Sequence, residues 1–122
     1  MTNRQHFTIN GRLPGYNELT KGGWRANYIA KKKGLEQAGW SIKSAQIQPM
    51  TGKVEVTIRC YEPNSRRDCD NATSGASKII LDSLQNCGIL KGDGQKYVKC
   101  IKHPVEVDRQ APRIEVLIRT DV

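Results

Sequence analysis

Alternation of apolar and polar residues predicts the β-strands of this chain. The clearest case is Lys53–Cys60, where Val54, Val56, Ile58 and Cys60 alternate with polar residues. This is the pattern of a strand that buries one face and exposes the other. Similar but shorter patterns predict three further strands, at Gln5–Ile9, Tyr97–Ile101 and Arg113–Arg119. The sequence therefore predicts about four strands.

Two segments carry apolar residues at helical spacing. The first is centred on Arg25–Lys43, and its apolar stripe would consist of Trp24, Tyr28, Leu35 and Ile42. Glycines interrupt this segment, and each glycine in a helix interior costs roughly 1 kcal/mol relative to alanine. We therefore expect this helix to be frayed or kinked.

The second helix is predicted over Ala76–Leu84, with Asn71 as its N-cap and Gly88 in the left-handed conformation after its end. The order of elements indicates an α+β fold in a single domain, residues 1–122. We expect a small mixed β-sheet of about four strands with two helices packed on it. The other face of the sheet would be left for a partner subunit.

Positive charge is concentrated in the first half of the chain. The formal net charge is +8; residues 1–53 hold nine Lys/Arg against two Glu, and the remainder holds eleven against ten acids. Such a surface attracts phosphate backbones. The candidates for phosphate contacts here are Arg25, Lys31, Lys32 and Lys33. The alternative is a basic face that only keeps the protein soluble.

Neither a membrane span nor a signal peptide is expected. No apolar run approaches the length of a span, and residues 1–6 lack the apolar core of a leader. We therefore expect a protein that remains in the cytoplasm. The four cysteines contain no CxxC pair, so we expect reduced, partly buried thiols and no zinc ribbon.

A small group of acidic residues follows the strongest predicted strand. Between Pro63 and Gln95 the acidic residues are Asp68, Asp70, Asp82 and Asp93. On an extended backbone, the first two would point to the same side. Mg²⁺ prefers carboxylate oxygens, with water or phosphate completing its shell. An acidic site in a basic chain is explained if metal ions lie between these acids and a nucleic-acid phosphate.

The block from Asp68-Cys69-Asp70-Asn71 to Asp93 resembles the RusA family of Holliday junction resolvases. The other matching features are a helix with Lys78 and Asp82, the Gly88-Ile89-Leu90 segment, and Pro14 followed by Asn17 near the start. The resemblance implies a RusA-like fold and a homodimeric endonuclease, dependent on Mg²⁺ or Mn²⁺, that resolves four-way DNA junctions by phosphodiester hydrolysis in recombination and repair. It also implies a bacterial or phage origin.

By the same resemblance, the catalytic acids and metal ligands would be Asp68, Asp70 and Asp93, and Lys78 would be the catalytic lysine. Lys78 follows Asp70 by eight residues, whereas the family pattern has four. Either the helix has an additional turn, or residues 73–76 form a loop. Gly92 also departs from the family pattern, because many members have an acid at this position.

Several of these residues also have purely structural interpretations. Asp68 and Asp70 would then pair with Arg66 and Arg67, which are otherwise candidates for phosphate contacts. Lys78 would pair with Asp82 across one helical turn, for about 0.2–0.5 kcal/mol.

Asn71 would cap its helix or support the metal ligands through its amide. Trp24, Tyr28 and Trp40 are candidates for stacking on unpaired bases, although we expect at least two of them to pack in the core. His103 has no evident ligand set.

Three functions follow from these interpretations. The first is a metal-dependent junction resolvase, with nucleases acting on other branched DNA as a close variant. The second is a DNA-binding module without catalytic activity. The third is an enzyme acting on another phosphate substrate, which the basic first half of the chain disfavours.

Overall fold

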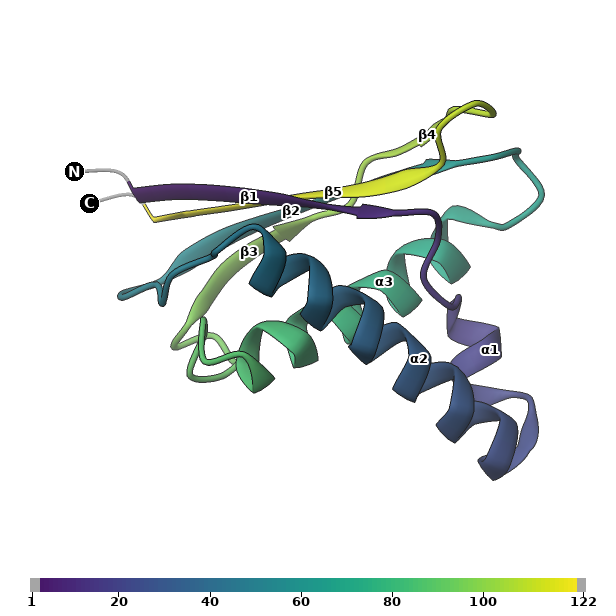
Figure 1. Ribbon diagram of the computed structural model, residues 1–122, viewed down its shortest axis with the longest axis horizontal. Coiled ribbons are helices and arrows are strands. Elements are labelled where there is room, and N and C mark those ends of the chain that lie inside the picture. Colours follow the sequence, from purple (N-terminus) through teal and green to yellow (C-terminus); the bar gives the residue numbers. More distant parts are fainter. Residues whose placement is uncertain (1–2, 121–122) are drawn as a thin grey trace.

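A mixed five-stranded β-sheet with helices packed on one face forms the body of the protein (Figure 1). The computed structural model describes residues 3–120. Along the chain, the elements are β1 (Asn3–Asn10), α1 (Tyr16–Thr20), α2 (Gly23–Ser44), β2 (Val54–Glu62), α3 (Cys69–Asn86), β3 (Val98–Lys102), β4 (Val105–Val107) and β5 (Arg113–Thr120). The predicted α+β class is confirmed.

The strand order is β1-β5-β2-β3, and β4 also pairs with β2. Strand β5 runs antiparallel to both β1 and β2, whereas β3 and β4 run parallel to β2. Thr57 pairs with Lys102 and Cys60 with Val105, so β3 and β4 keep the same register against β2. They therefore form one edge strand that is interrupted at His103 and Pro104.

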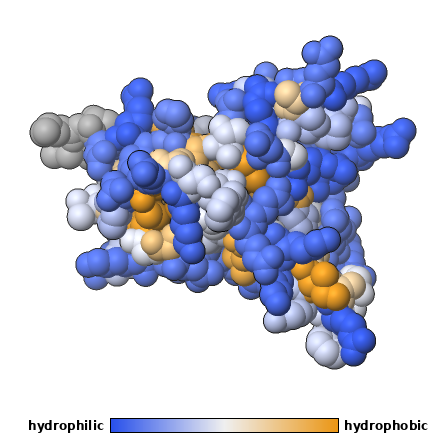
Figure 2. Space-filling view, viewed as in Figure 1, coloured by the Kyte–Doolittle hydropathy of each residue, from blue (hydrophilic) through white to orange (hydrophobic). Residues whose placement is uncertain are grey.

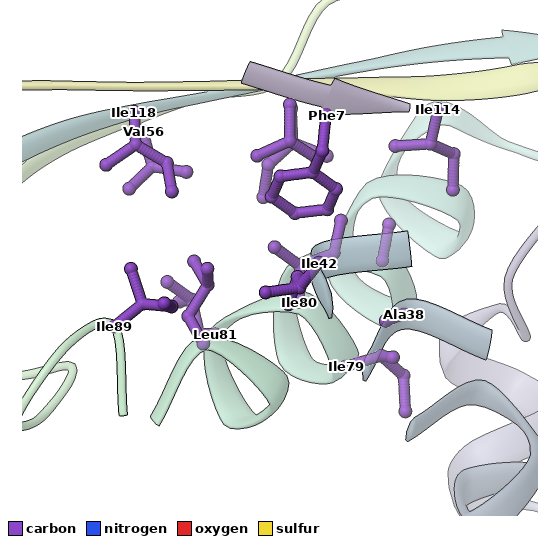
Figure 3. Close-up of a cluster of buried hydrophobic side chains, with 14 of the residues drawn as sticks. Phe7, Ala38, Ile42, Val56, Ile79, Ile80, Leu81, Ile89, Ile114 and Ile118 are labelled. Carbon is purple, nitrogen blue, oxygen red and sulfur yellow. The ribbon is translucent and has the colours of Figure 1, made fainter. Parts of the chain in front are cut away.

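The core lies between the sheet and the helices, and alternation builds its sheet side. In β2, Val54, Val56, Ile58 and Cys60 are all buried, which confirms the strand predicted from their spacing. Figure 3 shows the inward side chains of the sheet meeting apolar side chains of α2 and α3. Each fully buried aliphatic side chain contributes roughly 1.5–3 kcal/mol. The opposite face of the sheet carries partly exposed residues such as Thr57 and Arg59.

Helix α3 begins seven residues earlier than predicted, at Cys69, and Asp68 is its N-cap in place of Asn71. Asp70 consequently lies in the first helical turn, so the expected extended backbone across Asp68–Asp70 is wrong. Asn, Thr, Ser and Gly between residues 71 and 77 are weak helix formers. Tertiary packing overrides that preference. At Gly75 the helix lies so close to the segment before α1 that a Cβ would collide with the Pro14 carbonyl oxygen. Gly88, after the helix, has the predicted positive φ of 76°.

Helix α2 is continuous across its internal glycines, and only its C-terminal half is buried. Its buried residues are Gly34, Ala38 and Ile42. The expected core packing of at least two of the three aromatic residues is wrong, since Trp24, Tyr28 and Trp40 are all more than half exposed. For Trp24 and Tyr28, Figure 1 shows the reason, because the N-terminal half of α2 extends beyond the sheet.

None of the helices in residues 3–120 combines the length and the hydropathy needed to cross a lipid bilayer.

Candidate functional site

The predicted acidic motif lies at the N-terminal end of α3. The Asp68 carbonyl accepts the Ala72 N–H at 3.0 Å, but its exposed carboxylate forms no capping hydrogen bond. Asp70 is exposed one turn further, where its Oδ1 lies 3.5 Å from the Ser74 hydroxyl. The helix dipole favours carboxylates at this end. The helix dipole therefore stabilises both carboxylates at this position even without a metal.

A cavity of about 430 Å³ brings several predicted site residues together. Asp70 and Lys78 line it from α3, Asp93 from the following loop, and His103 from the break between β3 and β4. The other lining residues are Thr73, Ser74, Ser77 and Leu81 of α3. Asp68 is not among the lining residues.

Within residues 3–120, no three acidic, histidine or cysteine side chains approach closely enough to form a metal-binding group. The structure thus brings Asp70 and Asp93 to one cavity without assembling a cage of three carboxylates.

Lys78 is on the same side of α3 as Asp70 because the helix between them is unbroken. Eight residues make slightly more than two helical turns, so both side chains face the cavity. The alternative of a loop at residues 73–76 is therefore wrong.

The predicted pair with Asp82 is present. Lys78 Nζ lies 3.6 Å from Asp82 Oδ2, and Lys31 Nζ of α2 lies 3.6 Å from the same oxygen. Asp82 thereby joins two lysines from different helices.

His103 is the residue that sequence reasoning missed. Pro104 follows it where the edge strand is interrupted, and this break lies beside the cavity. Partial burial lowers the pKa of His103 below its ordinary value of 6.5, so the neutral imidazole is favoured at neutral pH. A neutral imidazole is able to accept a hydrogen bond or bind a cation. The location of His103 beside the cavity depends on how β3 and β4 pair with β2, and the sequence alone does not show that pairing.

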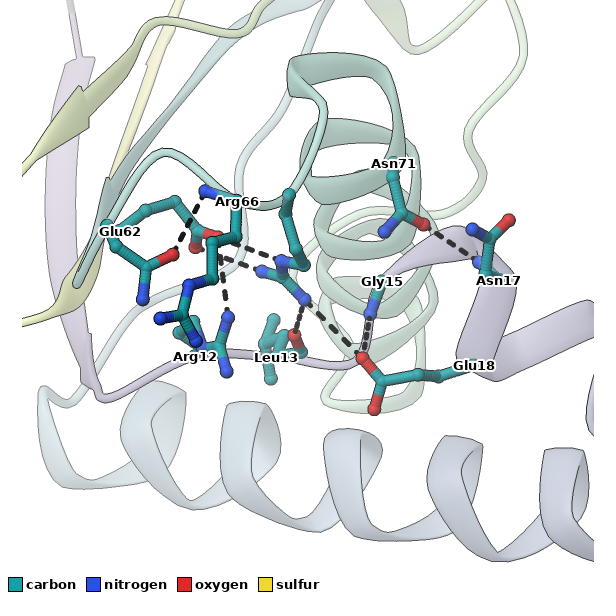
Figure 4. Close-up of polar contacts among 10 residues, drawn as sticks. Arg12, Leu13, Gly15, Asn17, Glu18, Glu62, Arg66 and Asn71 are labelled. Atoms are coloured by element: carbon teal, nitrogen blue, oxygen red, sulfur yellow. Dashed lines mark hydrogen bonds and ion pairs between the residues drawn. The ribbon is translucent and has the colours of Figure 1, made fainter.

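Arg67 faces inward, away from solvent. Its Nε and Nη2 donate to the two carboxylate oxygens of Glu62 at 2.8 and 2.9 Å, and its Nη1 donates to the Leu13 carbonyl at 3.0 Å (Figure 4). Glu62 is buried, and Arg12 lies 3.7 Å from it.

This engagement leaves the Arg67 guanidinium committed to contacts within the protein, whereas Arg66 remains exposed. The alternative in which Asp68 and Asp70 pair with these arginines is not observed: no ion pair within residues 3–120 includes either aspartate.

Asn71 connects α3 to the segment that precedes α2. Its Oδ1 accepts the N–H of Asn17 at 2.8 Å, in the first turn of α1 (Figure 4). The prediction that Asn71 caps its own helix is therefore wrong: Asp68 occupies the N-cap of α3, and the Asn71 side chain instead binds the first turn of α1. This hydrogen bond gives Asn71, one of the residues quoted for the family resemblance, a structural role beside Asn17.

The remaining predicted contacts with phosphate, Arg25, Lys31, Lys32 and Lys33, are all exposed on the N-terminal half of α2. Comparison with protein-family models found no match for the chain, and comparison with curated proteins found none either. The site is thus defined by two carboxylates, a lysine and an imidazole around a solvent-open cavity, next to a helix rich in lysine. Such a set is suited to binding a divalent cation together with a phosphate.

Proposed function

We propose that this chain is a divalent-metal-dependent endonuclease that cuts branched DNA, with the four-way junction as its substrate. The observation that supports the proposal most strongly is that Asp70, Lys78 and Asp93 line one cavity. Asp70 and Asp93 lie 23 positions apart in the chain, and only the helix and its following loop bring them together. All of the residues that line this cavity except His103 lie within the block, Asp68 to Asp93, that resembles RusA resolvases.

Mg²⁺ or Mn²⁺ fits the donors that are present. Asp70 and Asp93 have no cationic partner within residues 3–120. One or two carboxylates are the usual protein contribution to a Mg²⁺ site, with waters and substrate phosphates as the other ligands. When bound, the ion would polarise the scissile phosphate and lower the pKa of an attacking water. Asp68 would join these ligands only if its side chain turned towards the cavity.

The chain's own groups would orient the phosphate and balance its charge. Lys78 would stabilise negative charge on the phosphate oxygens, because its ammonium borders the cavity. Asp82 would hold that ammonium in place through the ion pair at 3.6 Å. A neutral His103, which also lines the cavity, would accept a hydrogen bond.

The surrounding charge is consistent with DNA as the substrate. Arg25, Arg66 and Lys31–Lys33 are exposed and would contact phosphates, whereas Arg67 is left out because Glu62 engages it. Symmetric cutting of a two-fold junction needs two active sites, so a homodimer is part of the proposal. We infer that the protein acts on bacterial or phage DNA in the cytoplasm.

Cleavage assays on a synthetic four-way junction test the proposal. Labelled junction, linear duplex and free nucleotides are each incubated with the protein in Mg²⁺, Mn²⁺ or EDTA. We expect metal-dependent cutting of the junction alone. Asp70→Asn should abolish cutting and retain junction binding, whereas Glu106→Gln, which removes an exposed carboxylate outside the cavity, should cut normally. Cutting by Asp70→Asn at the wild-type rate would refute the role of Asp70.

A DNA-binding module without catalytic activity is the second candidate. The observation that favours it is the lack of a group of three metal-binding side chains within residues 3–120. Junction binding that is equal in Mg²⁺ and EDTA, with no cutting by the wild-type protein under any condition tested, would select this candidate.

A further inference from the structure

One face of α2 continues past the body of the protein. Trp24, Tyr28, Lys31, Leu35 and Ile42 share this face, because their spacings are close to whole helical turns. In the C-terminal half the face is covered, and Ile42 is buried in the core. The N-terminal half has no buried residue before Gly34, and Trp24 and Tyr28 are 78% and 62% exposed. Two aromatic side chains on this face are therefore mostly exposed to solvent.

Positive charge surrounds these aromatic residues. Between Glu18 and Glu36 the chain has five basic residues and no acidic residue. The Arg25 guanidinium lies 5.6 Å from the centre of the Trp24 ring, within the range of a cation–π contact. Figure 2 shows mostly hydrophilic residues at this end of the molecule. The surface thus combines aromatic faces with cations.

A groove along α2 lies near the candidate active site. Tyr28, Lys31, Lys32, Leu35 and Glu36 line a depression of about 480 Å³ along α2. Lys31 reaches Asp82 of α3 at 3.6 Å, and Lys78 meets the same carboxylate oxygen from the cavity side. The groove and the cavity are therefore linked by two ion pairs to one aspartate, Asp82. A chain of phosphates leaving the cavity would encounter this groove next.

We propose that the N-terminal half of α2 is a stacking arm for unpaired bases of the DNA strand that leaves the active site. The inference rests on the proposed function, since it takes DNA as the substrate. Tyr28 and Trp24 would stack on successive bases, and Lys31, Lys32 and Arg25 would contact the intervening phosphates. Bases inside a duplex have both faces covered by their neighbours, so the arm would prefer single strands and branch points.

Charge favours a nucleic acid over a second copy of this chain as the occupant. In a two-fold contact through this surface, Arg25, Lys31 and Lys32 would face the same residues of the partner, against one acidic residue in the lining of the groove, Glu36. Juxtaposed like charges oppose such an interface. A polyanion with exposed aromatic faces is complementary to both features of the surface.

Tryptophan fluorescence tests the arm without relying on cleavage. Trp40→Phe leaves Trp24 as the single tryptophan. This protein is titrated, in EDTA, with a single-stranded oligonucleotide, with its duplex, and with a four-way junction. We expect strong quenching of Trp24 by the single strand and the junction and weak quenching by the duplex. The Trp24→Ser/Tyr28→Ser variant should bind the single strand about tenfold more weakly and the duplex nearly as well.

Ile29→Ser is the matched control, because Ile29 is exposed on the other side of the same helix, outside the groove. It should leave the affinity for single strands unchanged. Equal quenching by single strand and duplex, or no quenching while DNA binds, would overturn the arm. So would dissociation of an oligomer into monomers in Trp24→Ser/Tyr28→Ser, which would make the surface an interface between copies.

The arm and the nuclease can fail separately. Selective quenching by single strands, combined with no Mg²⁺-dependent cutting, would support the arm and refute the nuclease. Cutting of the junction without selective quenching would refute the arm and support the nuclease.

Discussion

The two sides of α3 use polar residues in opposite ways. Towards β1 and α1, two polar side chains near the start of the helix have protein partners: Arg67 binds Glu62, and Asn71 accepts the Asn17 N–H. Towards the cavity, Asp70 has only a long contact with Ser74, and Asp93 has no hydrogen bond or ion pair within residues 3–120. The first side holds the helix in place, whereas the second leaves its acids free for a ligand. The following predictions test this distinction by comparing losses of stability and of activity.

Removing Arg67, which is mostly shielded from solvent, should have the largest effect on stability. Arg67→Ala would leave the Glu62 carboxylate buried, with only the more distant Arg12 at 3.7 Å. Breaking a buried ion pair in this way costs about 3–5 kcal/mol in the free energy of unfolding. Urea denaturation followed by circular dichroism measures the loss. Arg59→Ala, which breaks the exposed pair with Glu106, is the control and should cost about 0–1 kcal/mol.

A double variant sharpens the same test. Arg67→Met/Glu62→Leu leaves neither charge buried, so it should be less destabilised than Arg67→Ala. If the double variant is the less stable of the two, Arg67 and Glu62 stabilise the protein by a route other than mutual charge compensation.

Close packing against the segment before α1 should have the next largest effect. Gly75→Ala adds a Cβ that would collide with the Pro14 carbonyl oxygen and crowd Gly15. Overpacking of this kind costs about 1–3 kcal/mol. Gly39→Ala is the matched control, because a Cβ at Gly39 of α2 would meet nothing within 4 Å. Thermal unfolding should show a lower Tm for Gly75→Ala and an equal or higher Tm for Gly39→Ala, and the reverse order would contradict the collision.

The residues of the sheet core were the most accessible to sequence reasoning. The alternation in Lys53–Cys60 is a local pattern that reports burial directly, and β2 is indeed buried on that face. Elements without a strong local pattern were missed. Helix α1 has five residues, and β4 has three and depends on pairing with β2 after Pro104.

The candidate site was predicted less well, for a physical reason. Which acids converge depends on whether Asp68–Asp70 is extended or helical, and that choice is made by packing of Gly75 against Pro14. The partner of Arg67 likewise depends on the tertiary approach of β2 to the loop before α3. For α2, the periodicity showed an apolar face but not that the helix has no buried residue before Gly34.

Asp82 lies between the two sides of α3, and its replacement should have an intermediate effect on stability. Asp82→Asn releases Lys78 and Lys31, two partly exposed pairs, so the loss of stability should be below about 1 kcal/mol. Lys78→Ala should cost no more in stability, but it should reduce junction cleavage far more than Asp82→Asn does. Single-turnover rates measured on both variants check this. Equal, small losses of rate would show that Lys78 serves the ion pair alone.

Asp93→Asn should leave stability almost unchanged, within about 0.5 kcal/mol of the wild type. Its exposed carboxylate has no partner within residues 3–120, so the neutral amide loses no contact. Cleavage should nevertheless be abolished, and junction binding in EDTA should be retained. This combination separates a ligand of the metal from a structural acid, because Arg67→Ala should lower stability and activity together. A stability loss above about 2 kcal/mol in Asp93→Asn would mean that the cavity side of α3 is structural after all.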